Sequence, residues 1–198
     1  MVDSDFKEQK KNAVEILKAG GVVCFPTETA YGLAADATNA KAVRRIFEIK
    51  GRGKEKTFPL IAASQSMVEK YAILSPIIRR LVKKYWPGPL TVVAPIRRGV
   101  ELARGTVRGR TIAIRVPNHP IARELSKRLG RPIVSTSANV SGEPVCYSIR
   151  AVKKQFVDQK FQPDFYLDVG RLPKRKPSTI VMEKNGEIVV LRQGEIKL

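Results

Sequence analysis

Four short segments of the sequence carry more polar side chains than a packed core or a solvated surface requires. Each lies at or near the end of an apolar strand or helix, and in α/β proteins such ends are where loops converge to bind ligands. The segments combine cationic side chains, which hold phosphates and carboxylates, with small hydroxyls and amides. They are PTETAYGL (26–33), KGRGKEK (50–56), TIAIR (111–115) and STSANVSG (135–142).

Two of these segments offer groups suited to phosphates. Lys50, Arg52 and Lys56 supply cationic donors, Arg52 as a planar fork and the lysines as point charges. Ser137 and Asn139 are two residues apart, and their short side chains can hold a phosphate oxygen or a metal-bound water. The spacing of these residues also fits other roles: a solvated loop for Lys50–Lys56, and an ordinary turn with a helix cap for Ser137 and Asn139. Neither GxxxxGK[ST] nor GxGxxG occurs, so an ATP site here has to be built from side chains.

The histidine and cysteine content argues against several kinds of catalysis. The single histidine, His119, leaves no basis for a Ser-His-Asp relay or a zinc site. It lies in an NHP turn, where we interpret it as a solvated helix cap. Cys24 and Cys146 are far apart and lack the spacing of a metal or redox pair. We therefore expect Cys24 to be a buried structural thiol.

Periodicity predicts the elements that position these segments. Apolar stripes indicate helices that begin at Asn39, Ser75 and Pro120, and Asn185-Gly186 predicts a β-hairpin between two C-terminal strands. The fold class is therefore α/β, a twisted mixed sheet with flanking helices. Strict alternation over 111–116 places Thr111 and Arg115 on one face of a strand.

Composition limits the class of protein and its partners. The chain has 198 residues, 43% of them hydrophobic, which fits a single domain over 1–198. Its formal charge is +19 and its pI about 10.3, which points to anionic partners. No stretch reaches the roughly 20 apolar residues of a membrane span, and the N-terminus has no apolar signal region. We expect a cytoplasmic protein that has no membrane partner.

The motifs taken together resemble the YrdC family of threonylcarbamoyl-AMP synthases. The resemblance covers nearly the whole chain in the family's order. It implies a YrdC-like α/β fold with a large cationic concave face. It also implies that L-threonine, bicarbonate and ATP give threonylcarbamoyl-adenylate and pyrophosphate, for modification of tRNA next to the anticodon. The motifs are the four segments above with WPGPLT (86–91), AIRVPNHP (113–120), PSTIV (177–181) and VLRQG (190–194).

The resemblance also implies roles for individual residues. No dedicated metal ligands are expected, since Mg²⁺ would be held mainly by the ATP phosphates, and no other cofactor is implied. Lys50 and Arg52 would be catalytic, at the reacting phosphate. The expected ATP contacts are Arg52, Lys56, Thr111, Ser137, Asn139 and Arg192. The expected L-threonine contacts are Thr29, Arg115, Ser135 and Ser178.

Some positions depart from the family pattern. Close relatives of a longer, two-domain form often carry a histidine where this chain has Ile61, which weakens the transfer of one threonine contact. Some relatives carry a serine where Val145 stands, so one nucleotide contact is missing or comes from the backbone. Tyr31 either floors the pocket or packs against the sheet, and the sequence leaves both roles open.

The alternative function is an RNA-binding module of the same fold without synthase activity. Its basis is the clustering of cations, which would neutralise phosphates of tRNA or double-stranded RNA. A cation-rich solvated surface explains the same clusters. Proteins of the tRNA threonylcarbamoylation pathway are further candidate partners. The clusters are Arg79, Arg80, Lys83 and Lys84; Arg97, Arg98, Arg104, Arg108 and Arg110; and Lys174, Arg175 and Lys176.

Overall fold

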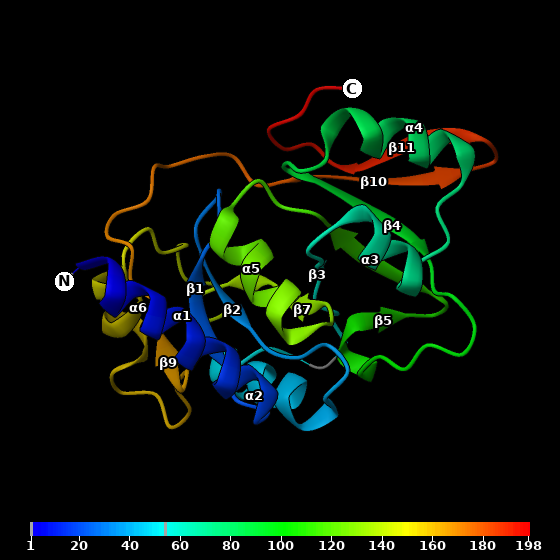
Figure 1. Cartoon of the computed structure of the whole chain (residues 1–198). Helices are drawn as coiled ribbons and strands as arrows, with labels where there is room; N and C mark the ends of the chain where they lie inside the picture. The colour runs from blue at the N-terminus through cyan, green and yellow to red at the C-terminus, as the bar shows by residue number, and fades with distance from the viewer. Residues whose placement is uncertain (1, 54) are drawn as a thin grey trace.

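The helices lie around two β-sheets (Figure 1). The computed structural model describes residues 2–53 and 55–198, and the side chains from residue 6 onward within these ranges. None of the described helices is long and apolar enough to cross a membrane. The helices are α1 (Val2–Lys18), α2 (Ala40–Lys50), α3 (Gln65–Tyr71), α4 (Pro76–Tyr85), α5 (Pro120–Leu129) and α6 (Ile149–Phe156), with a 3₁₀ turn η1 (Arg104–Thr106).

The strands divide between the two sheets, and both sheets mix parallel and antiparallel pairs. The first has the order β8-β2-β1-β9, and the second has the order β11-β10-β4-β6-β3-β7 with β5 paired to β6. The α/β class with mixed pairing is therefore confirmed. The strands are β1 (Val23–Pro26), β2 (Tyr31–Ala34), β3 (Leu60–Ile61), β4 (Leu90–Pro95), β5 (Val107–Arg108), β6 (Thr111–Arg115), β7 (Ile133–Val134), β8 (Thr136–Ser137), β9 (Phe165–Tyr166), β10 (Thr179–Lys184) and β11 (Glu187–Arg192).

Local signals in the sequence set several element boundaries. The Asn39 side chain accepts from the amides of Lys41 and Ala42 and starts α2, which ends at Gly51 in the left-handed conformation. The β10–β11 hairpin turns at Asn185 and Gly186, both with positive φ. A two-residue hairpin turn of this kind requires positive φ at both positions, which Asn-Gly adopts most readily.

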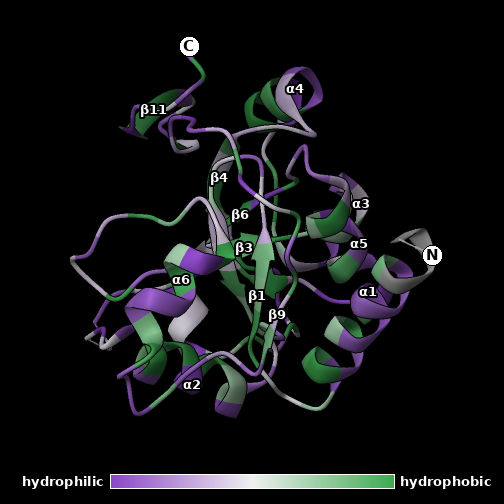
Figure 2. Cartoon of the chain, turned by 90° about the vertical axis from the view of Figure 1, so that its left-hand side faces the viewer, coloured by the Kyte–Doolittle hydropathy of each residue, from purple (hydrophilic) through white to green (hydrophobic). Residues whose placement is uncertain are grey.

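Apolar faces of the helices join the two sheets into one packed interior. The largest cluster of buried side chains includes members of both sheets, such as Leu33 of β2 and Val92 of β4. A second cluster lies where α1 and α5 pack together over β1. Figure 2 shows the hydrophobic surfaces of these helices turned toward the strands.

Two chain crossings between the sheets create the setting of the site. The first is short: β7 belongs to one sheet and β8 to the other, and Ser135 lies between them. The second is the long segment without regular structure from β9 to β10, drawn in orange in Figure 1. Residues of both crossings face the same cavity.

Candidate functional site

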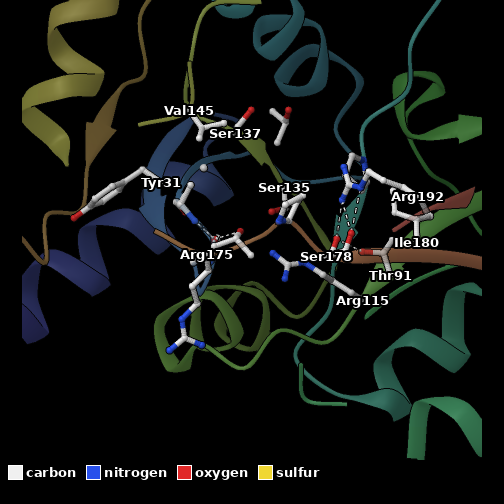
Figure 3. A pocket seen from close by; sticks show the side chains of 18 of the residues that line it. Tyr31, Thr91, Arg115, Ser135, Ser137, Val145, Arg175, Ser178, Ile180 and Arg192 are labelled. Atoms are coloured by element: carbon white, nitrogen blue, oxygen red, sulfur yellow. Dashed lines mark hydrogen bonds between the residues drawn. The ribbon is translucent and has the colours of Figure 1, made fainter. Parts of the chain in front are cut away.

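The larger of two neighbouring cavities, which we call the central pocket, has a volume of about 510 Å³ (Figure 3). Its lining includes no acidic residue among those that the structure describes. Four arginines border it, which matches the predicted cationic concave face: Arg52, Arg115, Arg175 and Arg192. It brings together these residues predicted from the sequence: Thr29, Arg52, Arg115, Ser135, Ser137, Ser178 and Arg192.

A smaller cavity, the side pocket, has a volume of about 300 Å³. Arg52 and Ser137 border both cavities and therefore stand at their junction. The side pocket is lined by Lys50, Gly51, Arg52, Gly53, Lys56, Ser137, Asn139, Ser141 and Gly142. A ligand that reached from one pocket into the other would pass between the guanidinium of Arg52 and the hydroxyl of Ser137.

Lys50, the last residue of α2, is buried and fixed by the STSAN loop. Its Nζ donates to the backbone oxygens of Ser137 at 2.6 Å and Asn139 at 2.7 Å, and to Asn139 Oδ1 at 3.1 Å. Burial, with the nearby charge of Arg52, lowers the pKa of Lys50 to about 8. An ammonium has three N–H donors, so these three acceptors use all of them.

The loop after β8 is closed by its own side chains. Ser137 Oγ donates to Asn139 Oδ1, and Asn139 Nδ2 donates to the Glu143 carbonyl. The Ser141 amide donates to the Lys50 carbonyl at 2.8 Å, which ties the loop to the end of α2. The loop therefore presents Ser137 at the junction of the pockets in a defined position.

Arg52 stands just beyond α2 without a polar partner. Its guanidinium lies over the Phe58 ring, 5.0 Å from the ring centroid. Its Nε is buried and makes no hydrogen bond within the described chain. Burial lowers the pKa of Arg52, although the group stays charged because its ordinary value lies above 12. A buried cationic donor without an acceptor is unfavourable, and an anion bound at the junction would supply the acceptor that Arg52 Nε lacks.

Arg115, at the end of β6, forms an ion pair with Glu28 of the PTET turn. The side chains are 9% and 7% exposed, so the pair is nearly buried. The second Glu28 oxygen, Oε2, has no partner in the described structure. Because the carboxylate neutralises the guanidinium from inside the protein, Arg115 brings little net charge to the central pocket.

His119 does not have the role that we expected. It is half-buried at the N-cap of α5, and its side chain makes no capping hydrogen bond. Its Nδ1 is buried without a partner among the described residues. Burial lowers the pKa of His119, an effect that Glu28 opposes and Arg115 reinforces. The interpretation as a solvated cap was wrong, because the side chain is half-buried and lies within the electrostatic influence of Glu28 and Arg115.

Ser178 and Arg192 come together where β10 begins and β11 ends. Arg192 donates to the Ser178 carbonyl from Nη2 at 2.7 Å and from Nε at 3.2 Å, and to Ser178 Oγ at 3.0 Å. The hydroxyls of Ser178 and Thr91 are 2.9 Å apart. Burial and the charge of Arg115 lower the pKa of Arg192. The hairpin thus delivers Arg192 to the pocket with much of its guanidinium already bonded.

Tyr31 borders the central pocket and also anchors the long crossing. Its side chain is fully buried, and in Figure 3 the hydroxyl is directed away from Ser178. That hydroxyl donates to the Gly170 carbonyl at 2.8 Å and accepts from the Val169 amide at 3.0 Å. Both roles left open by the sequence therefore apply: Tyr31 borders the central pocket, and its side chain is part of the packed core.

Thr111 borders neither pocket, unlike the other residues predicted for the site. Its hydroxyl donates to the Arg108 carbonyl at 2.9 Å. Alternation puts Thr111 and Arg115 on one face of β6, but four residues of strand separate them by roughly 13 Å. The period-2 pattern identified a shared face and carried no information on distance along the strand.

Some residues that line the central pocket, or pair with a residue that does, were not assigned to the site from the sequence. Arg175 had been grouped with the surface cations, and Glu28 had been passed over within the PTET motif. Val145, at a departure from the family pattern, does border the central pocket. Ile61, at the other departure, is fully buried in the core and borders neither pocket.

A search of known families decides what these residues belong to. Residues 15–194 match the family described as "Telomere recombination", which groups Sua5, YciO and YrdC proteins. The chain belongs to the Sua5/YciO/YrdC family. The predicted recognition is thus confirmed.

Members of the Sua5/YciO/YrdC family resemble the chain over most of its length. The threonylcarbamoyl-AMP synthase of Klebsiella pneumoniae is 41% identical over 191 residues, 94% of this chain and 96% of that protein. Escherichia coli YciO superposes with a TM-score of 0.80 at 30% identity, over 93% of this chain and 88% of the other, and confirms the YrdC-like fold.

A longer family member has been solved with an amino acid bound. P. abyssi Sua5 complexed with L-threonine superposes with a TM-score of 0.85 at 36% identity over 93% of this chain. The present chain spans only about half of that protein, 54% of its length. The structural similarity therefore covers nearly all of this chain but only about half of Sua5.

Proposed function

We propose that the chain is a threonylcarbamoyl-AMP synthase. It would convert L-threonine, bicarbonate and ATP into threonylcarbamoyl-AMP, pyrophosphate and water, as a step toward the threonylcarbamoyl modification of tRNA next to the anticodon. The family membership supports this, as does the synthase relative that matches nearly end to end. The observation that carries the proposal is the junction of two cationic pockets at Arg52 and Ser137.

The two pockets match the two halves of the reaction. Arg115, Ser135 and Ser178 would hold threonine in the central pocket, together with Thr29. The adenylate half would reach Arg192 in the same cavity. The leaving pyrophosphate would occupy the side pocket, beside Lys56. The α-phosphorus would then stand at the junction, where Arg52 offers a donor without a partner inside the protein.

The reaction requires that the reactants be held in position and that the charge of the phosphates be neutralised. The threonine amine forms a carbamate with bicarbonate, and a carbamate oxygen attacks the α-phosphorus as pyrophosphate leaves. No protein nucleophile is needed, because held reactants and neutralised phosphate charge lower the barrier. Arg52 would neutralise charge at the reacting phosphate, and Ser137 would orient it.

Lys50 and Thr111 take different places in this proposal from the other site residues. All three donors of Lys50 are used by the loop, so we assign it the positioning of Ser137 and Asn139 rather than direct phosphate contact. Asn139 would act mainly through the same network. For Thr111 the nucleotide contact stays a prediction, with no support from its position outside both pockets.

Mg²⁺ would enter with ATP. The residues described include no group of three or more His, Cys, Asp or Glu placed to hold a metal ion. Mg²⁺ in phosphate-transfer sites commonly keeps several waters and binds substrate phosphates with few protein ligands. The side pocket fits such a complex, because its oxygen donors are the neutral Ser137, Asn139 and Ser141.

Residues 1–198 would form one YrdC-like domain that acts in the cytoplasm. The shared apolar cluster between the sheets supports a single domain. Proteins that carry the adenylate onward to tRNA would be its partners.

The direct test is the reaction itself. Purified protein with L-threonine, bicarbonate, ATP and Mg²⁺ should release pyrophosphate and form an adenylate of the expected mass. Arg52→Ala should lower kcat on the order of 100-fold, as loss of a donor to transition-state charge commonly does. The matched control is Arg97→Ala, an exposed cation that follows β4 and borders neither pocket. Absence of turnover in the wild type, together with salt-sensitive RNA binding, would favour the non-catalytic alternative.

RNA binding remains a second candidate function because of one helix. Arg79, Arg80, Lys83 and Lys84 are all exposed on α4 and follow one another at helical spacing. Such a row can neutralise successive phosphates of tRNA or double-stranded RNA.

A further inference from the structure

A short basic segment of the long crossing borders the central pocket. We call residues 173–177, Pro-Lys-Arg-Lys-Pro, the basic strap; all five are exposed. It is fixed at both ends by buried neighbours. The Leu172 amide donates to the Tyr147 carbonyl at 2.8 Å, and Ser178 is held by Thr91 and Arg192. A proline at each end further restricts the backbone.

Of the three cations of the basic strap, Arg175 alone borders the central pocket. Lys174 and Lys176 are absent from its lining, although they are equally charged and also exposed. No hydrogen bond or ion pair joins the Arg175 guanidinium to any residue that the structure describes. In Figure 3 the side chain extends away from Ser178 and Arg192.

Two of the other three arginines of the pocket are already engaged within the protein. Glu28 neutralises Arg115, and Ser178 takes several donors of Arg192. Arg52 stands at the junction with the side pocket, on the phosphate side. An amino acid carboxylate in the central pocket would therefore find Arg115 with its charge cancelled, and would still need a cation to balance it.

We propose that Arg175 is a second carboxylate-binding residue for the amino acid substrate, turning inward when the central pocket is occupied. This rests on the proposed function. Arg175 is three residues from Ser178, which we place at the threonine, and both residues border the central pocket. A guanidinium holds a carboxylate through two parallel hydrogen bonds, and rotation of a long unbonded side chain is enough to bring it there.

The test compares threonine with threoninamide, which lacks the carboxylate charge. Binding of each to the full chain is measured by calorimetry, and KM values for threonine and ATP by pyrophosphate release. Arg175→Ala should weaken threonine binding about tenfold, as expected for a charge-assisted contact. It should change threoninamide binding and the KM for ATP less than twofold. Lys174→Ala and Lys176→Ala, which remove the same charge beside it, should leave threonine binding unchanged.

Other outcomes overturn the inference in distinguishable ways. Equal losses for threonine and threoninamide would mean that Arg175 does not read the carboxylate. Equal effects of Arg175→Ala and Lys174→Ala would mean that only the general charge of the strap matters. A rise in the KM for ATP alone would place Arg175 at the nucleotide. A wild-type chain that neither binds threonine nor releases pyrophosphate would overturn the proposed function, and this inference with it.

Discussion

Glu28 and Arg115 form a nearly buried ion pair beneath the central pocket, although 87 positions separate them in the sequence. The pair joins the turn between β1 and β2 in one sheet to the end of β6 in the other. It therefore fixes the relative position of the two sheets at the place where the pocket lies. It also sets the charge that the pocket presents to a ligand.

Removal of one partner should destabilise the fold. Glu28→Ala leaves the Arg115 guanidinium desolvated without its counter-ion, and we expect a loss of about 3 kcal/mol in the free energy of unfolding. Urea denaturation followed by circular dichroism measures this. The control is Glu69→Ala, which breaks the more exposed pair with Arg79 and should cost less than about 1 kcal/mol. Equal losses in the two variants would contradict the structural weight given to the buried pair.

Activity should depend on the protonation of Lys50. Its pKa is lowered to about 8, so the ammonium loses a proton above that pH. A neutral amine has two N–H donors for three loop acceptors, and the loop that presents Ser137 should loosen. We expect kcat/KM for ATP to fall above about pH 8. In the profile of kcat the corresponding fall should occur at higher pH, because the bound triphosphate favours the charged form of the Lys50 amine. A profile that is flat to pH 10 would refute this.

The lowered pKa of Lys50 should make the fold more stable as the pH rises, although activity falls. The folded-state pKa of Lys50 lies below its ordinary value of 10.5, so between about pH 8 and 10.5 the unfolded chain binds more protons. The free energy of unfolding gains a contribution that increases with pH across this window. Lys50→Met should remove that contribution, which is measured as the difference in slope between variant and wild type.

The Tyr31 hydroxyl should hold the start of the long crossing. Tyr31→Phe leaves the Val169 amide and the Gly170 carbonyl without their partner, at a cost of about 1–3 kcal/mol. Hydrogen exchange should accelerate at the Val169 amide. Tyr85→Phe is the matched control, since the Tyr85 hydroxyl bonds to no described residue. If exchange at Val169 were unchanged in Tyr31→Phe, the anchor would lie elsewhere.

The cations of α4 test the RNA-binding candidate. Replacing all four with alanine should weaken tRNA binding and reduce the slope of log K against log salt by about 3, because Arg79 is already paired with Glu69. Filter binding at several salt concentrations measures both. The control replaces the exposed α6 cations Arg150, Lys153 and Lys154. Unchanged affinity and slope in the α4 variant would leave that helix as a solvated surface.

Local signals account for what could be predicted of the fold. Asn39 accepts from amides two and three residues away, and Asn185-Gly186 adopts positive φ within its own turn. Such interactions need no distant partner, so the residue types alone specify them. The cationic motif from Lys50 to Lys56 likewise follows directly on a helix that the apolar pattern predicts. Most members of the predicted site were found for this reason and through the family resemblance.

What remained undetermined depends on contacts between segments far apart in the chain. The sequence by itself determined the class of fold, the family and the set of polar groups that gather around the pockets. Only the tertiary structure decided that Thr111 lies outside them, that Glu28 cancels the charge of Arg115, and that Arg175 borders the cavity while Lys174 does not. Burial and pairing of a charge depend on which distant side chains surround it, and residue types along the chain do not encode that arrangement locally.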